Sequence, residues 1–291
     1  MKTETRGLLL GLLAVAAFSL TLPATRAALV SFEPVFVCAA RIVLAAGLAA
    51  AYLAIGRHRL PNRSELKALC AVVAGVVFGF PLFTALAMQH VDASHGGVVL
   101  GIMPLTVAAT GALVFKERPS PSFWLFAVLG SAVVVAFSLL RSHGGIEPAD
   151  IYLLIAVVTA SVSYAVGATV SRSLGGLQTI SWALLMGLPI WIPTVILTFP
   201  ATLAATPGAW IGLLYVALIS QFLGFLPWFR GLALGGIARV GQTQLLQPFL
   251  TIIASALLLG EAVDAMTIGF AVAVFAIVAA GRHFGTLRRG T

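Results

Sequence analysis

Three polar side chains interrupt an apolar stretch near the end of the chain. Gln244, Gln247 and Thr251 are spaced by three and four residues, which places them on one face of a helix. An amide costs several kcal/mol to bury in hydrocarbon without a partner, so this face is expected to meet a wet cavity or another helix. Two interpretations follow: the face lines a solute path, or it bonds neighbouring helices at about 0.5–2 kcal/mol per contact. Pro248 is expected to leave the Gln244 carbonyl without its helical partner.

Other polar and aromatic side chains extend this set. Gln221, Phe225 and Trp228 share a helical face by their spacing, and the Tyr164 hydroxyl needs a partner in an apolar run. The predicted substrate-binding residues are Ser19, Phe78, Tyr164, Gln221, Trp228, Gln244, Gln247 and Thr251. Trp228 beside Arg230 also suits an anchor at the membrane interface, and Phe78 also suits a packed core.

Proline and glycine indicate where helices could bend. Pro104 and Pro248 lie in two apolar runs, and Gly101 precedes Pro104 by three residues. Such positions kink helices or allow close packing. We predict that Pro104, Pro248 and Gly101 form hinges, with tight static packing as the alternative.

The elements that hold these residues must be membrane helices. Of the 291 residues, 60% are hydrophobic and 9% are charged, whereas a soluble domain carries roughly a quarter of charged residues. Cys38, Cys70 and the scattered histidines form no ligand spacing, so no metal, cofactor or enzymatic centre is expected. The net charge of +8 is attributed to the membrane surface and not to nucleic acid.

The apolar runs predict the number and direction of the spans. About 20 apolar residues cross a bilayer, which gives ten spans, over residues 7–28, 34–55, 66–88, 93–114, 122–140, 151–171, 179–199, 207–231, 237–258 and 262–281. Of the 17 lysines and arginines, all but Arg26, Arg41 and Arg141 fall on one side when the N-terminus is placed inside. The positive-inside rule therefore predicts that both termini are cytoplasmic.

The two halves of the chain resemble each other. At an offset of 144 residues Ser19 meets Ser163, Pro104 meets Pro248 and Glu117 meets Glu261. Residues 1–145 and 146–291 are therefore predicted to be two five-helix repeats, which makes residues 7–28 a span and not a secretory signal. An odd number of spans inverts the second repeat, and inverted repeats build many secondary transporters around a site near the bilayer midplane.

The motifs "KERPSPSFW", "LLLGEAVDAMTIGFA" and "FVCAARIVLAAGL" resemble the drug/metabolite transporter superfamily. More closely, the chain resembles its EamA-type exporters, which include the YddG-like aromatic amino-acid exporters. The resemblance implies an exporter of the bacterial inner membrane that works by alternating access. It also implies that spans 1, 3, 4, 6, 8 and 9 line a central cavity, and that spans 2, 5, 7 and 10 lie outside it.

The charged residues constrain substrate and driving force. All nine acidic residues map to span ends or connections, so no membrane carboxylate is expected to carry protons, and facilitated transport or exchange is predicted. His95 is the possible proton-coupling residue, although an interfacial polar role suits it as well.

Arg41 is expected to be structural, since it falls on an outer span. The predicted partner is a small neutral or zwitterionic solute such as an aromatic or hydrophobic amino acid, taken by a monomer or weak dimer in the lipid bilayer. The alternative is a proton-driven multidrug or lipophilic-cation pump.

Overall fold

The computed structural model describes residues 3–114, 121–141, 147–202, 204–236 and 240–284, and all regular secondary structure in these ranges is helical. The first half contains α1 (Thr3–Ser19), α2 (Thr21–Leu29), α3 (Pro34–Ile55), α4 (Arg63–Val72), η1 (Val73–Gly79), α5 (Phe80–Ala87), α6 (Ala93–Leu100), α7 (Met103–Val114) and α8 (Pro121–Arg141). The second half contains α9 (Pro148–Leu174), α10 (Gly176–Leu197), α11 (Pro207–Leu214), η2 (Tyr215–Leu223), α12 (Phe225–Gly235), η3 (Gly241–Leu246), α14 (Gln247–Leu259) and α15 (Ala265–Phe284).

Helices occupy each of the ranges predicted as spans, and within the described residues seven of them are long and apolar enough to cross a membrane. The other three predicted ranges hold shorter apolar helices, over Trp124–Phe137, Thr243–Leu259 and Ala265–Ile277. Large aliphatic side chains are exposed on the outer faces, such as Leu257 at 79% and Leu113 at 70%. Such faces suit contact with lipid, as expected of a multi-pass membrane protein.

Local sequence explains where several helices begin and end. Asn62 and Glu65 form a capping box at the start of α4, in which each side chain accepts the backbone N–H of the other residue. Pro34 and Pro148 occupy the first turns of α3 and α9, where the missing N–H of proline costs nothing. Gly175 separates α9 from α10 at a φ of 93°, a conformation that residues with a Cβ rarely adopt.

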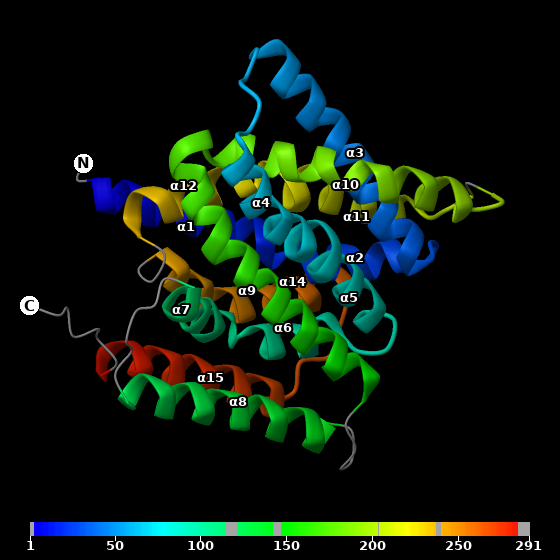
Figure 1. Ribbon diagram of the computed structural model, residues 1–291. Coiled ribbons are helices and arrows are strands. Elements are labelled where there is room, and N and C mark those ends of the chain that lie inside the picture. Colours follow the sequence, from blue (N-terminus) through cyan, green and yellow to red (C-terminus); the bar gives the residue numbers. More distant parts are fainter. Residues whose placement is uncertain (1–2, 115–120, 142–146, 203, 237–239, 285–291) are drawn as a thin grey trace, which may run out of the picture.

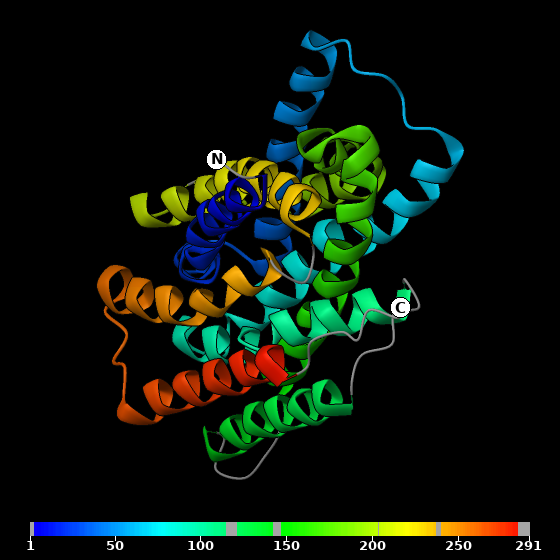
Figure 2. The same cartoon turned by 90° about the vertical axis from the view of Figure 1, so that its left-hand side faces the viewer.

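The helices are arranged as a central group with a separate pair at its edge. The helices α8 and α15 run side by side at the bottom of Figures 1 and 2, and they were predicted to lie outside the cavity. α3 packs along α10, and α1 packs along α12. The start of α1 and the end of α15 lie on the same side of the molecule, at the left of Figure 1.

Close packing between the halves depends on small residues. A Cβ on Gly212 would lie 2.4 Å from the carbonyl oxygen of Ala24, so only glycine lets α11 approach α2 this closely. A Cβ on Gly75 would lie 2.1 Å from the carbonyl oxygen of Thr159, which brings η1 equally close to α9. Glycine is used in the same way between packed membrane helices in general.

Candidate functional site

A narrow internal cavity lies where segments from both halves converge. Its volume is about 10 Å³, enough for about one water molecule. The lining residues are Phe18, Thr21, Arg41, Val76 and Phe80 from the first half, and Tyr164, Ser220, Gln221, Phe225 and Gln247 from the second. Neither half alone would enclose this cavity.

Polar contacts in the cavity wall join segments that are far apart in the sequence. The hydroxyls of Thr21 and Ser220 lie 2.8 Å apart, and Nη2 of Arg41 donates to Oγ of Ser220 at 3.3 Å. Nε2 of Gln221 donates to the carbonyl of Val76 at 2.7 Å. The wall is therefore a junction that both halves must form together.

Arg41 is the charged residue of this wall. The sequence interpretation placed its helix outside the cavity and gave it a structural role, but α3 brings the side chain into the lining, where it is 2% exposed. Its Nε and Nη1 atoms have no hydrogen-bond partner among the described residues. No carboxylate of the described residues lies within 4.0 Å of it.

Two π-helical segments contribute to the cavity wall and contact each other there. Val76 belongs to η1, and Ser220 and Gln221 belong to η2. A π-helix bonds each N–H to the carbonyl five residues back, and such segments often occur at functional sites. The continuous apolar sequence of both regions gives no sign of them, and their turns rotate the residues that follow.

One predicted aromatic residue lies outside the lining, and a neighbour lies in it. Phe78 stacks on Trp191 of α10, with ring centroids 4.9 Å apart, and is not part of the cavity lining. Phe80, just beyond the π-helical segment, lies in the lining instead. The sequence prediction selected Phe78 for its depth in the apolar run, and depth does not say which side of the helix faces the cavity.

An aromatic cluster lies beside the cavity. The rings of Phe18 and Phe225 are 5.1 Å apart, and Trp228 contacts Tyr164 at 5.2 Å and Phe18 at 6.1 Å. Trp228 is fully buried, which excludes an anchoring role at the membrane interface. It contacts the lining residues Tyr164 and Phe18 but does not itself line the cavity.

Gln244, Gln247 and Thr251, which were predicted to share one helical face, have different surroundings. One lines the cavity and one bonds a neighbouring helix. Gln247 lines the cavity, whereas the hydroxyl of Thr251 donates to the carbonyl of Ser19 at 2.9 Å and so joins two helices. Gln244 is 2% exposed, lies outside the lining, and has no side-chain partner among the described residues. Its carbonyl is not free, since it accepts the N–H of Gln247 at the end of the 3-10 helix η3, so that expectation was wrong.

Ser19 ends α1, directly before the turn that separates α1 from α2. Its hydroxyl donates to the carbonyl of Val15 at 2.6 Å. Ser19 is not part of the cavity lining, and its carbonyl instead accepts the hydrogen bond from Thr251.

Both predicted hinge regions coincide with breaks in helices. α6 ends at Leu100 and α7 begins at Met103, so the break contains Gly101 and lies just before Pro104. In the second half, η3 gives way to α14 at Gln247, just before Pro248. The two breaks are in contact, because a Cβ on Gly101 would lie 3.2 Å from Cγ of Pro248.

A cluster that we call the Glu261 network joins the halves at the start of α6. The Glu261 carboxylate accepts the N–H of Ala93 at 2.9 Å and of Ser94 at 3.0 Å, and it lies 3.4 Å from Nε of Arg26. Arg26 also pairs with Asp92 at 2.6 Å and bonds the carbonyl of Val91. A carboxylate at the N-terminus of a helix is favoured by the free N–H groups and by the helix dipole. Glu117, the predicted counterpart of Glu261, lies outside the described residues.

His95 forms a second link near this end. Its Nε2 atom lies 2.8 Å from Oδ1 of Asp150 at the start of α9, and both residues are buried. The ring of Phe137 lies against His95 at 4.8 Å. Asp150 lies in the first turn of α9, at a span end as predicted, and the helix packing encloses its carboxylate.

A second cluster, the Glu65 network, joins the halves where α4 begins and α9 ends. The Glu65 carboxylate accepts two hydrogen bonds from Arg59, at 2.7 and 2.8 Å, and one from the hydroxyl of Ser173 on α9 at 2.7 Å. The hydrogen bond to Glu65 raises the pKa of Arg59 above its usual value. Nearby, the amide of Gln178 contacts the ring of His58 at 3.0 Å.

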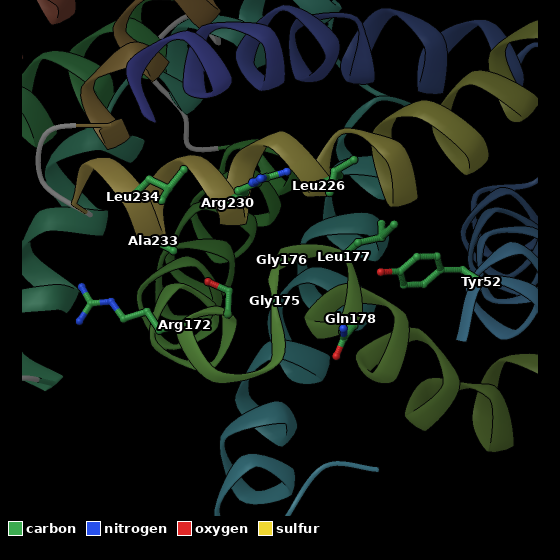
Figure 3. A pocket seen from close by; sticks show the side chains of 11 residues that line it. Tyr52, Arg172, Gly175, Gly176, Leu177, Gln178, Leu226, Arg230, Ala233 and Leu234 are labelled. Carbon is green, nitrogen blue, oxygen red and sulfur yellow. The ribbon is translucent and has the colours of Figure 1, made fainter. Parts of the chain in front are cut away.

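A larger hollow near this network opens to the surface. Its volume is about 420 Å³, and Figure 3 shows Tyr52, Gly176, Leu177, Leu226 and Arg230 around it. The Arg172 side chain points away from the other lining residues. This hollow contains none of the predicted binding residues, so the central cavity is the better candidate for a solute site.

The described residues contain no group of three or more His, Cys, Asp or Glu that could hold a metal ion.

The comparison with protein families gives the class of the protein. The model of the EamA-like transporter family matches residues 5–139 and again residues 147–280. The chain belongs to the EamA-like transporter family. This family is part of the drug/metabolite transporter superfamily, and membership indicates a membrane transporter and not an enzyme.

Related proteins agree with this class. The chain is 42% identical over 285 residues to the uncharacterized transporter YdeK of Bacillus subtilis (strain 168), covering 98% of this chain and 99% of YdeK. It is 22% identical to the uncharacterized transporter YyaM of the same organism, over 77% of this chain and 76% of YyaM. A crystal structure of another protein shares the fold, with a TM-score of 0.68 at 19% identity over 97% of each chain.

Proposed function

We propose that this EamA-like transporter exports small metabolites across the bacterial inner membrane by alternating access to the central cavity. The observation that carries the proposal is the position of the cavity. Both halves enclose it, and it lies between the Glu261 network and the Glu65 network. Opening one network at a time would expose the cavity to one side at a time. In the orientation predicted from the basic residues, the Glu261 network faces outward and the Glu65 network faces the cytoplasm.

We further propose that ten spans form two inverted five-helix repeats. The family model matches each half separately, the π-helical segments η1 and η2 occupy corresponding positions, and both halves break just before a corresponding proline. The first helix starts and the last helix ends on the same side, which suits an even number of crossings and two cytoplasmic termini. The three shorter apolar helices would then cross as well.

The proposed substrate class is the amino acids with an aromatic or hydrophobic side chain. The cavity offers two amides, three hydroxyls and three phenyl rings, which suit a small solute with one polar and one apolar end. None of the described residues that line the cavity carries a carboxylate, so a lipophilic cation would lack a counter-charge there. This favours amino-acid export over the alternative of multidrug cation efflux.

Purified protein in liposomes tests the proposal. We expect counterflow of radiolabelled phenylalanine or leucine, and none of quaternary ammonium compounds. Counterflow of the cations without that of any amino acid would support the alternative.

We propose that transport occurs by facilitated diffusion or exchange. The buried His95–Asp150 pair is the observation that supports a second candidate, proton antiport. His95 is the residue proposed for proton coupling, because its Nε2 atom lies 2.8 Å from Oδ1 of Asp150 in a buried pair between two helices, and the Glu261 carboxylate binds the amides of the two residues that precede His95. Facilitated transport predicts that a pH gradient across the liposome gives no accumulation of substrate. Accumulation that disappears in both His95→Gln and Asp150→Asn would establish proton antiport instead.

A further inference from the structure

We propose that Arg41 binds the carboxylate of the transported solute, so that the protein selects carboxylate-bearing substrates. The inference rests on the transport function proposed above and defines the chemistry of its substrate site. The observation behind it is an almost fully buried guanidinium at the central cavity with no acidic partner among the described residues.

An unpaired buried charge requires compensation. Moving an isolated charged group from water into a medium of low dielectric constant is so unfavourable that buried charges are normally paired. Arginine does not escape this cost by losing its proton, because its guanidinium remains charged in proteins. Arg41 makes one hydrogen bond, which Nη2 donates to the neutral hydroxyl oxygen of Ser220 at 3.3 Å, and this does not offset a full charge.

The remaining donors of Arg41 are suited to an anion. Nε and Nη1 have no partner among the described residues, and the side chain reaches the cavity that Tyr164 and Gln247 also line. A carboxylate bound there would form charge-assisted hydrogen bonds, which are about twice as strong as neutral ones. The phenyl rings of Phe18, Phe80 and Phe225 line the same cavity and suit the apolar part of the solute.

The position of Arg41 links this contact to the movement of the halves. Ser220 binds both Arg41 of α3 and Thr21 of α2, so a carboxylate at Arg41 would touch the junction between the halves. A substrate that neutralises the guanidinium would therefore stabilise the closed cavity more than a solute without a charge.

The test compares ligands that differ at one group. Binding of phenylalanine, phenylalaninamide, phenethylamine and benzoate to the purified protein is measured by competition with radiolabelled phenylalanine and by thermal protection. We expect wild-type protein to bind phenylalanine at least about tenfold more tightly than phenylalaninamide, which corresponds to about 1.4 kcal/mol. This comparison needs no variant and is independent of any effect of mutation on folding.

Variants then assign the preference to Arg41. We expect Arg41→Gln to bind the acid and the amide equally, and Arg41→Lys to keep part of the preference. Arg172→Gln, an exposed arginine outside the central cavity, is the matched control and should keep all of it.

The inference is overturned if wild-type protein binds acid and amide alike, or if folded Arg41→Gln keeps the preference. If amino acids are nevertheless transported in liposomes, the proposed function stands and only the role of Arg41 fails. If no carboxylate protects the wild type while phenethylamine or quaternary cations do, both fail together in favour of cation efflux.

Discussion

At the scale of single residues, Gln244 is the side chain whose surroundings fit it least. Its amide nitrogen and oxygen are buried without a partner among the described residues. A buried unsatisfied polar group costs about 1–3 kcal/mol, and methionine has a similar shape without that cost. Gln244→Met is therefore expected to raise the stability by about 1–2 kcal/mol.

The thermal midpoint of unfolding in detergent measures this change. Gln247→Met provides the matched control, because its amide lies at the cavity and is not among the unpartnered buried groups, so no gain is expected. A lower midpoint for Gln244→Met than for wild type would show that the Gln244 amide has a partner after all.

At the level of single residues, the sequence predicted part of the cavity wall. Polarity and depth in the apolar runs were enough to select Tyr164, Gln221 and Gln247, which the structure brings together. Arg41 could not be selected, because its contact with Ser220 spans 179 residues of sequence and depends on how α3 packs. Hydropathy gives the depth of a residue along its helix, but it does not say which neighbour that residue faces.

At the scale of elements, the two broken helices are the parts best placed to move. The breaks before Pro104 and Pro248 contact each other through Gly101, as expected if the two hinges move together. Proline removes a backbone donor and prevents a continuous helix, whereas alanine would allow one. We expect Pro104→Ala and Pro248→Ala to slow transport about tenfold or more while substrate affinity changes less than about threefold.

Liposome transport rates and equilibrium binding together check this prediction. Pro193→Ala is the control, because Pro193 lies inside α10 on an exposed face away from the breaks. Wild-type transport rates in both break variants would instead support static packing at these prolines.

The Glu261 network is a second feature at this scale. Its carboxylate holds the first turn of α6 through the amides of Ala93 and Ser94. Removing a capping side chain costs about 0.5–2 kcal/mol. Glu261→Ala is therefore expected to increase hydrogen exchange at these two amides by about three- to thirtyfold.

Hydrogen-exchange mass spectrometry in detergent measures the effect. Glu33→Ala serves as the control, since Glu33 precedes α3 but makes no side-chain cap hydrogen bond. Unchanged exchange at the start of α6 in Glu261→Ala would mean that the network does not hold this end closed.

Elements were easier to predict than their internal irregularities. Apolar runs of about 20 residues placed helices within a few residues of their observed bounds, because burial in lipid requires that length. The π-helical segments η1 and η2 were not predicted, since their sequences read as uninterrupted apolar helix. At Gly75, η1 also approaches α9 closely, a tertiary contact that no local pattern records.

At the scale of the whole molecule, the central cavity is small and lies between the Glu261 and Glu65 networks that join the halves. The cavity has room for about one water molecule, and interhalf networks are formed at both of its ends. A transporter that alternates between two open forms must pass through such a state. The pair α8 and α15 lies at the edge of the central group, and none of its described residues lines the cavity.

The most direct test of the account is whether the central cavity can be reached from each side of the membrane. Ser220→Cys places a thiol of nearly the same size in the lining, in a background in which Cys38 and Cys70 are replaced by alanine. Ser181→Cys, fully buried in α10 away from the cavity, is the matched control. We predict that a membrane-impermeant thiol reagent labels Ser220→Cys from either side of oriented liposomes and leaves the control unlabelled. Labelling of Ser220→Cys from one side alone, or from neither, would contradict alternating access through this cavity.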